Sequence, residues 1–263
     1  MRLEDIQLAI RPRSLLECLD IAFLFCGQHW VGLLLASAVG VVPLMIFNEW
    51  LLWRSPLDFY IAYLILAMEV PWATAFLTLY LGQVTFSKRF SLKRAARDFL
   101  RSLDRLIVYQ VLIRGICLLM VVLAPVPFFG MYFINEIILL EQTPLTHTWG
   151  RRTAMNSRTL AKIVSLRLME MVALVLGTLI VGAMLRTISE LWEDRFQFHP
   201  DVVFTNLFET DWQTRIAFWV MIIFLTVFRF VSYLDCRIRR EGWDVELKLR
   251  AHSTRYHQRE AAL

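Results

Sequence analysis

The chain has 263 residues, of which 57% are hydrophobic and 13% aromatic, and its mean hydropathy is +0.53. Soluble domains are roughly 45 to 50% apolar, so this composition excludes an ordinary soluble domain and predicts an all-α, polytopic membrane protein. The net charge of +5 could suggest nucleic acid, but the cations lie beside apolar runs. Anionic lipid of the inner leaflet is the nearer partner there, and we expect no nucleic-acid binding.

The N-terminal segment MRLEDIQLAI carries Glu4 and Asp5 where a secretory signal would be basic. We therefore expect the first apolar run to stay in the mature protein. One bilayer crossing needs roughly 20 apolar residues, and the apolar runs predict six crossings. They are residues 31–48, 59–83, 106–140 (as two crossings), 163–185 and 214–234.

Two of these runs contain helix breakers. Pro71 lies in the middle of the second crossing and predicts a kink there. The long run at 106–140 is interrupted by APVPFFG at residues 124–130. This interruption predicts a tight turn between a third crossing and a short fourth one.

Lysine and arginine are distributed unevenly between the crossings. They gather between crossings two and three, between four and five, and in the C-terminal tail, whereas the other two connections are poor in them. Basic connections stay in the cytoplasm. The sequence therefore predicts a multi-pass protein of the cell inner membrane with both termini cytoplasmic.

Residues 91–106 have the pattern of an amphipathic surface helix. The apolar face consists of Leu92, Ala95, Ala96, Phe99, Leu103 and Leu106, and the polar face of Lys93, Arg94, Arg97, Asp98, Arg101, Asp104 and Arg105. Similar patterns precede crossings one and five, which favours three units of a surface helix plus a transmembrane hairpin within one membrane domain. The units would be residues 1–86, 87–142 and 143–234, followed by a cytoplasmic tail at 235–263.

Five ionisable side chains lie inside the predicted crossings: Glu69, Arg114, Glu136, Glu170 and Arg229. Arg167 stands near the start of the fifth crossing. Each costs about 2.5 to 3.5 kcal/mol at a helix centre, so we expect these groups to face the bundle interior and to be paired. They are either a polar pathway for an ion, a proton or a polar substrate, or ion pairs and snorkelling side chains with a structural role.

The C-terminal stretch YLDCRIRREGWDVEL is rich in charges of both signs. Its motif residues are Tyr233, Asp235, Arg237, Arg239, Glu241, Gly242 and Asp244. We expect pairs four residues apart along a continued helix, an end or bend at Gly242, and arginines that anchor at the inner leaflet or pair with a neighbouring cytoplasmic segment.

No motif of a hydrolase or a phosphate-binding loop is present, and the four cysteines lack metal-ligand spacing. His199 stands near Asp194 and Asp201, but histidines and aspartates in a loop are mostly solvated. We therefore expect no catalytic residue, no metal and no cofactor.

The stretch LLEQTPLTHTWGRRTAMNSRTL, residues 139–160, resembles bacterial multi-pass proteins related to the glycerophosphoryl diester phosphodiesterase membrane domain. Glu141, Pro144 and Arg152 would match its acidic residue, proline and basic surface helix. The C-terminal motif is similar to the ending of the same group. The resemblance implies the membrane part without the catalytic domain, and work beside cell-envelope and ATPase partners.

These observations favour a non-enzymatic membrane scaffold or accessory subunit of a cell-envelope complex, with protein partners in the membrane or at its cytoplasmic face. A transporter or channel component that uses the intramembrane glutamates and arginines is the alternative. A membrane enzyme acting on lipid or cell-wall precursors is the third class left open.

Overall fold

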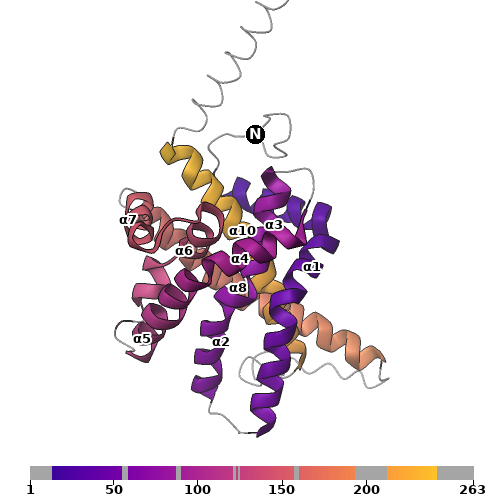
Figure 1. The fold of residues 1–263 in the computed structure, drawn as a ribbon. Helices are drawn as coiled ribbons and strands as arrows, with labels where there is room; N and C mark the ends of the chain where they lie inside the picture. The colour runs from indigo at the N-terminus through magenta and orange to yellow at the C-terminus, as the bar shows by residue number, and fades with distance from the viewer. Residues whose placement is uncertain are drawn as a thin grey trace, which may run out of the picture.

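A computed structural model describes residues 14–54, 59–86, 90–120, 123, 125–156, 160–192 and 212–241. Helices make up nearly all of this part of the chain, and it contains no strand. The predicted all-α class is therefore confirmed. Figure 1 shows the helices as a bundle in which α10 (Trp212–Glu241) packs against α8 (Leu160–Trp192), α1 (Leu15–Arg54) and α3 (Ala75–Phe86).

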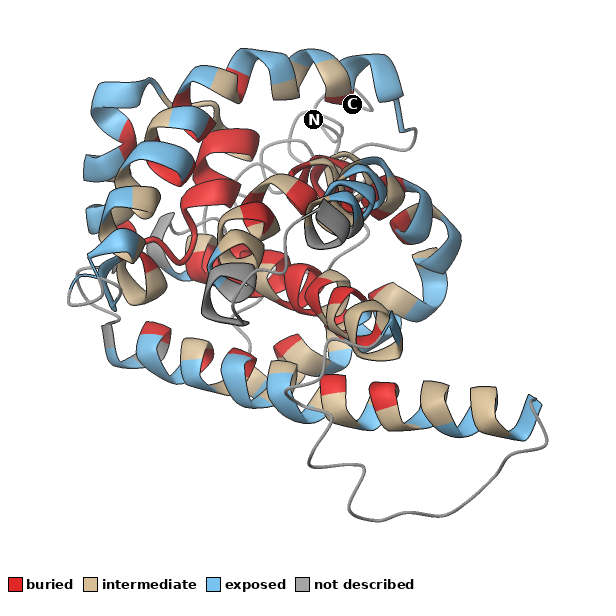
Figure 2. Cartoon of the chain, turned by 90° about the horizontal axis from the view of Figure 1, so that it is seen from below, coloured by how far each residue is buried: buried red, intermediate tan, exposed pale blue. Residues whose placement is uncertain are grey.

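Four of the described helical stretches are long and apolar enough to cross a membrane: Leu15–Asn48, Leu64–Phe86, Ile163–Trp192 and Trp212–Arg239. The first and third of these stretches are mostly exposed, with 22% and 11% of their apolar windows buried, and Figure 2 shows exposed residues along the outside of the bundle. On α8 the exposed side chains include Leu168, Val172, Leu176 and Ile180. An apolar surface this extensive requires lipid or another protein to cover it, so the fold is that of a membrane protein.

The helix α1 begins with a reciprocal cap and bends in the middle. The Ser14 backbone N–H donates to Glu17 Oε2 (2.8 Å), and the Glu17 N–H donates to Ser14 Oγ (3.2 Å), an arrangement that fixes a helix start. His29 has non-helical φ and ψ of −118° and 22°. This kink divides the stretch expected to lie on the membrane surface from the apolar run that follows it.

The helix that contains Pro71 is interrupted close to the position of the predicted kink. Helix α2 (Phe59–Ala73) ends two residues beyond Pro71, and α3 begins after Thr74. A proline removes a backbone donor and disturbs the turn around it. The Pro71 carbonyl accepts a hydrogen bond from Asn135 Nδ2 (3.0 Å), so the backbone next to the break is held by a side chain from elsewhere in the chain.

The expected surface helix and third crossing form one continuous helix. Helix α4 (Leu92–Leu106) passes through π-helical turns, η2 (Ile107–Ile113), into α5 (Arg114–Leu119), with helical backbone at both junctions. The chain returns through η4 (Val126–Gly130), α6 (Ile134–Glu136) and η5 (Ile137–Glu141).

This hairpin is short. Even at the α-helical rise of 1.5 Å per residue, its return arm from Val126 to Glu141 would be about 24 Å long, less than the roughly 30 Å hydrocarbon core. Neither arm is among the four described helices of crossing length. The described structure therefore supports four helices of crossing length, and the six crossings and the threefold repeat stay predictions.

Helix α7 (Leu145–Asn156) follows the hairpin and precedes α8. Most of α10 is buried, whereas α8 is exposed over most of its apolar length. The largest fully buried side chains include Tyr233, Phe228 and Phe230 of α10. The last helix is thus the centre of the bundle, and its charged end lies among segments that come from elsewhere in the chain.

Candidate functional site

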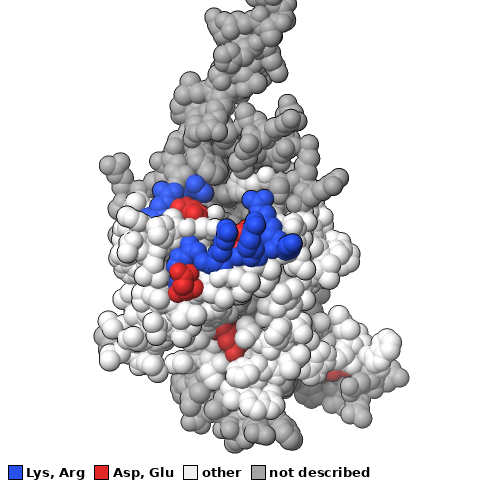
Figure 3. Space-filling view, viewed as in Figure 1, with Lys and Arg blue, Asp and Glu red and all other residues white. Residues whose placement is uncertain are grey.

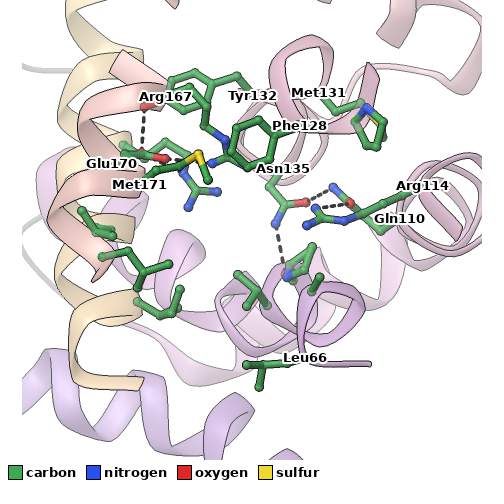
Figure 4. Close-up of a pocket in the computed structure, with 18 of the residues that line it drawn as sticks. Leu66, Gln110, Arg114, Phe128, Met131, Tyr132, Asn135, Arg167, Glu170 and Met171 are labelled. Carbon is green, nitrogen blue, oxygen red and sulfur yellow. Dashed lines mark hydrogen bonds and ion pairs between the residues drawn. The ribbon is translucent and has the colours of Figure 1, made fainter. Parts of the chain in front are cut away.

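A cavity of about 240 Å³ lies between α2, the hairpin, α8 and α10 (Figure 4). Its charged lining consists of Arg114 from α5, Arg167 and Glu170 from α8, and Arg229 from α10. The other walls are mainly apolar. The cavity therefore combines a polar cluster with hydrophobic walls, the usual composition of a binding pocket.

Glu170 is the acceptor at the centre of this cluster. Its Oε1 accepts the Tyr132 hydroxyl (2.7 Å) and lies 3.4 Å from Arg229 Nε, while its Oε2 lies 2.8 Å from Arg167 Nη1. The Arg167 guanidinium also lies 4.4 Å from the centre of the Phe128 ring. One carboxylate thus holds two arginines from two helices in place.

A second chain of hydrogen bonds borders the cavity. Arg114 Nη1 donates to Gln110 Oε1 (3.3 Å), Gln110 Nε2 to Asn135 Oδ1 (2.6 Å), and Asn135 to the Pro71 carbonyl, as Figure 4 shows. Gln110 lies in the π-helical turns of η2, which are frequent at functional sites. Within the described part of the chain, Arg114 has no carboxylate partner, and its buried Nε has no hydrogen bond.

The five predicted intramembrane residues do not form one group. Arg114, Glu170 and Arg229 line the cavity together with Arg167. Glu136 is 1% exposed and interacts electrostatically with Arg229 and Glu170, but it does not line the cavity.

Glu69 lies elsewhere in the fold. It accepts a hydrogen bond from Asn48 Nδ2 of α1 (2.6 Å), away from the cavity lining. Charge alone did not identify Gln110, Tyr132 and Asn135, which complete the polar network. Amides inside apolar runs were the signal that would have found Gln110 and Asn135, because buried amides need partners.

A second polar centre, the Glu141 clasp, consists of Glu141, Arg151, Tyr233 and Arg237. Glu141 Oε2 accepts from Arg151 Nε (2.7 Å), and Oε1 accepts the Tyr233 hydroxyl (2.7 Å). Arg237 Nε lies 3.6 Å from the same Oε1. The end of η5, helix α7 and helix α10 therefore meet at a single carboxylate.

The turn after Glu141 is held by the continuous helix of α4 and η2. Gln142 adopts a left-handed backbone with φ of 49°. Arg105 Nη1 of α4 donates to the Thr143 carbonyl (2.9 Å), and the Tyr109 hydroxyl donates to the Leu145 carbonyl (3.1 Å). Arg105 was predicted on the polar face of this surface helix, but it is 7% exposed and serves as a buried donor to this turn, so it is not available to lipid head groups.

The charged tail follows the expected pairing where it is described. Arg239 Nε lies 3.0 Å from Asp235 Oδ2, one helical turn apart. Glu241 is the last residue of α10, and only its backbone is described. Gly242 and Asp244 lie outside the described residues, as do Asp194, His199 and Asp201.

Helix α4 carries a row of exposed cations, drawn in blue across the middle of Figure 3. They are Lys93, Arg94, Arg97 and Arg101. On α7, the Arg152 guanidinium lies 4.0 Å from the centre of the Trp149 ring, and burial lowers its pKa from the ordinary value. These cations lie on helices expected to rest against the membrane surface.

No group of three or more histidine, cysteine, aspartate or glutamate side chains suited to a metal ion occurs among the described residues. The fold and the two polar centres define an α-helical membrane protein with an arginine-lined cavity and a carboxylate-centred clasp. Comparison with protein-family models, with curated proteins and with solved structures gave no match for this chain. The resemblance to the phosphodiesterase membrane domain group therefore stays a prediction from the two motif stretches.

Proposed function

We propose that this chain is a non-enzymatic scaffold or accessory subunit of a cell-envelope complex in the inner membrane. The Glu141 clasp is the observation that carries the proposal. It joins α7, α10 and the end of the hairpin, and Arg105 of α4 binds the turn directly after Glu141. A face assembled from four separate segments is suited to present a fixed surface to partners.

The clasp also brings together the two stretches that resemble the phosphodiesterase membrane domain group. Glu141 belongs to the first stretch, and Tyr233 and Arg237 belong to the second. Their contact supports a shared fold with that group and explains why both stretches would be needed in one protein.

The proposed arrangement has six membrane segments in three hairpin units, with the basic face and both termini in the cytoplasm. The kinked start of α1, helix α4 and helix α7 would be the three surface helices. The basic row of α4 would lie against anionic lipid head groups of the inner leaflet.

Cross-linking in native membranes, followed by purification of the full chain, tests the scaffold proposal. We expect at least one partner protein to be recovered repeatedly. Its recovery should fall in Glu141→Gln, which loosens the clasp, and should persist in Asp104→Asn, whose carboxylate is 70% exposed. Repeated recovery of the chain alone would contradict the proposal.

A transporter or channel component is the second candidate, and the arginine cavity favours it. Arg114→Ala should then abolish solute flux in reconstituted vesicles, because Arg114 lines the cavity. Glu69→Gln is a matched control, since Glu69 pairs with Asn48 outside the cavity lining. Absence of flux for the wild-type chain would remove this candidate.

A further inference from the structure

We propose that the arginine cavity binds the anionic head group and the first part of one alkyl chain of a membrane lipid. The proposal does not depend on the scaffold function. It rests on the charge of the cavity, on the order of polar and apolar residues along its helices, and on where the cavity opens.

The charge of the cavity favours an anion. Three of its lining residues are arginines and one is a glutamate. The buried Glu136 adds at most one more negative charge, which still leaves the arginines in excess. A buried cation without a counter-ion is costly at this depth, and an anionic ligand would lower that cost.

The Arg114 guanidinium has donors that the surrounding protein does not use. Within the described chain its only side-chain hydrogen bond is the 3.3 Å contact with Gln110, and its Nε is buried without a hydrogen-bond partner. Guanidinium groups bind phosphate and carboxylate oxygens through paired donors. A phosphate or carboxylate between Arg114 and the Glu170 cluster would use these donors.

The cavity changes from polar to apolar in one direction on three helices. On α8, Arg167 and Glu170 are followed by Leu174 and Val175. On α10 the order is reversed, with Arg229 preceded by Leu225, Ile222 and Phe218.

The two helices run antiparallel, since Glu170 contacts Arg229 at one end and Ser189 contacts Gln213 at the other. Their apolar ends therefore coincide. The α2 wall agrees, with Pro71 at the polar end and Leu66 away from it. From Arg229 to Phe218 the apolar wall is about 16 Å long, enough for part of an alkyl chain.

The cavity opens where lipid would be. Met171 and Val175 line it and are 42% and 48% exposed, and they stand next to the exposed Val172 and Leu176 along α8. A volume of about 240 Å³ holds a head group and part of one chain, and not a whole lipid. The remainder of the lipid would lie along α8 in the bilayer, which favours a lipid over a free anion as the source of the negative charge.

Three probes with matched parts test the proposal on the full chain in neutral detergent. Dodecyl phosphate has both head and tail, dodecanol has the tail alone, and inorganic phosphate has the head alone. Binding is measured as a concentration-dependent rise in the unfolding temperature. We expect dodecyl phosphate to bind about tenfold or more tightly than either of the other probes.

Two variants locate the binding. Arg114→Gln removes a lining guanidinium and should weaken dodecyl phosphate binding about tenfold. Arg97→Gln removes an arginine of α4 that is 61% exposed, and this change should leave the binding of dodecyl phosphate unchanged. Ala67→Phe keeps the charges and fills the apolar wall, so it should weaken dodecyl phosphate binding and not the weak binding of inorganic phosphate.

Two outcomes would overturn the proposal. Equal affinity for inorganic phosphate and dodecyl phosphate would make the cavity a free-anion site. Equal loss of binding in Arg114→Gln and Arg97→Gln would place the probe on the basic surface. If Arg114→Gln fails to fold, Ala67→Phe still decides, because unchanged dodecyl phosphate binding in that variant contradicts the assignment to the cavity.

Discussion

At the scale of single residues, Glu141 connects parts of the chain that are far apart in sequence. Its carboxylate is 9% exposed and takes donors from Arg151 and Tyr233, with Arg237 at 3.6 Å. Removing one partner from a buried charge network leaves the others unsatisfied, and that loss exceeds the net contribution of any single pair.

Glu141→Gln should therefore lower the free energy of unfolding in detergent by about 1 to 3 kcal/mol. The amide keeps the size of the side chain but loses the charge that holds Arg151 and Arg237. Asp104→Asn is the control, since its exposed pair with Arg105 should contribute about 0.5 kcal/mol or less. Similar unfolding curves for the two variants would contradict the role given to the clasp.

Tyr233→Phe should cost about 1 kcal/mol, because it removes the 2.7 Å hydrogen bond to Glu141 and nothing else of similar strength. The double variant with Glu141→Gln should lose less free energy of unfolding than the sum of the losses measured for the two single variants. Full additivity, measured in the same unfolding assay, would show that the two side chains do not act together.

The sequence predicted some of this residue-scale chemistry. The spacing of Asp235 and Arg239 indicated a pair along one helix, because helical neighbours are four residues apart. It could not single out Glu141 as the partner of Arg237, which lies 96 positions further along the chain. Such a contact depends on how helices pack, and one sequence carries no direct signal of it.

At the scale of elements, small residues set how closely helices approach. Gly40 of α1 lies directly against the backbone carbonyl of Ala73 at the α2–α3 break, so a methyl group there would collide with main chain. Close approach through glycine is a common way for membrane helices to pack. Gly27 in the same helix has no atom within 4 Å of the position a methyl group would take.

Gly40→Ala should lower the free energy of unfolding by about 1 to 3 kcal/mol, since main chain cannot move aside as a side chain does. Gly27→Ala should leave it unchanged or raise it by up to about 1 kcal/mol through better helix propensity. Thermal unfolding of both variants in the same detergent measures the difference. A loss in Gly27→Ala as large as that in Gly40→Ala would argue against the packing described for α1.

The element boundaries that the sequence predicted are those with a chemical marker. Pro71 marked the break between α2 and α3, and a charged face marked α4. The kink at His29 and the π-helical turns at 107–113 have no proline to mark them. Hydropathy alone does not report such local changes in helix geometry.

At the scale of the whole molecule, the sequence predicted a helical membrane protein. Apolar runs of about 20 residues are long enough to cross a bilayer as helices, and few other structures satisfy the backbone hydrogen bonds there. The sequence did not predict that the surface helix α4 continues without a break into the hairpin. Hydropathy indicates how deep a residue lies in the membrane, but not in which direction its side chain points around the helix. The sequence therefore did not separate Glu69 from the cavity residues.

The hairpin decides whether six segments cross the membrane. A short segment can cross if the bilayer thins or flanking side chains snorkel. In the proposed arrangement, the turn between α5 and η4 reaches the outer side, while α4, α7 and the end of α10 share the cytoplasmic side. The alternative is a hairpin that enters and leaves on one side, supported by four crossing helices.

Labelling of single cysteines in intact cells tests this arrangement most directly. The four native cysteines would first be replaced, and Leu123→Cys, at a position 42% exposed in the turn, would be treated with an impermeant maleimide. In the proposed orientation, Arg97→Cys serves as the cytoplasmic reference, and Trp192→Cys, 90% exposed at the end of α8, serves as the outer one. We predict that Leu123→Cys is labelled in intact cells, like Trp192→Cys. Labelling only after permeabilisation, like Arg97→Cys, or no labelling in either condition would contradict six crossings.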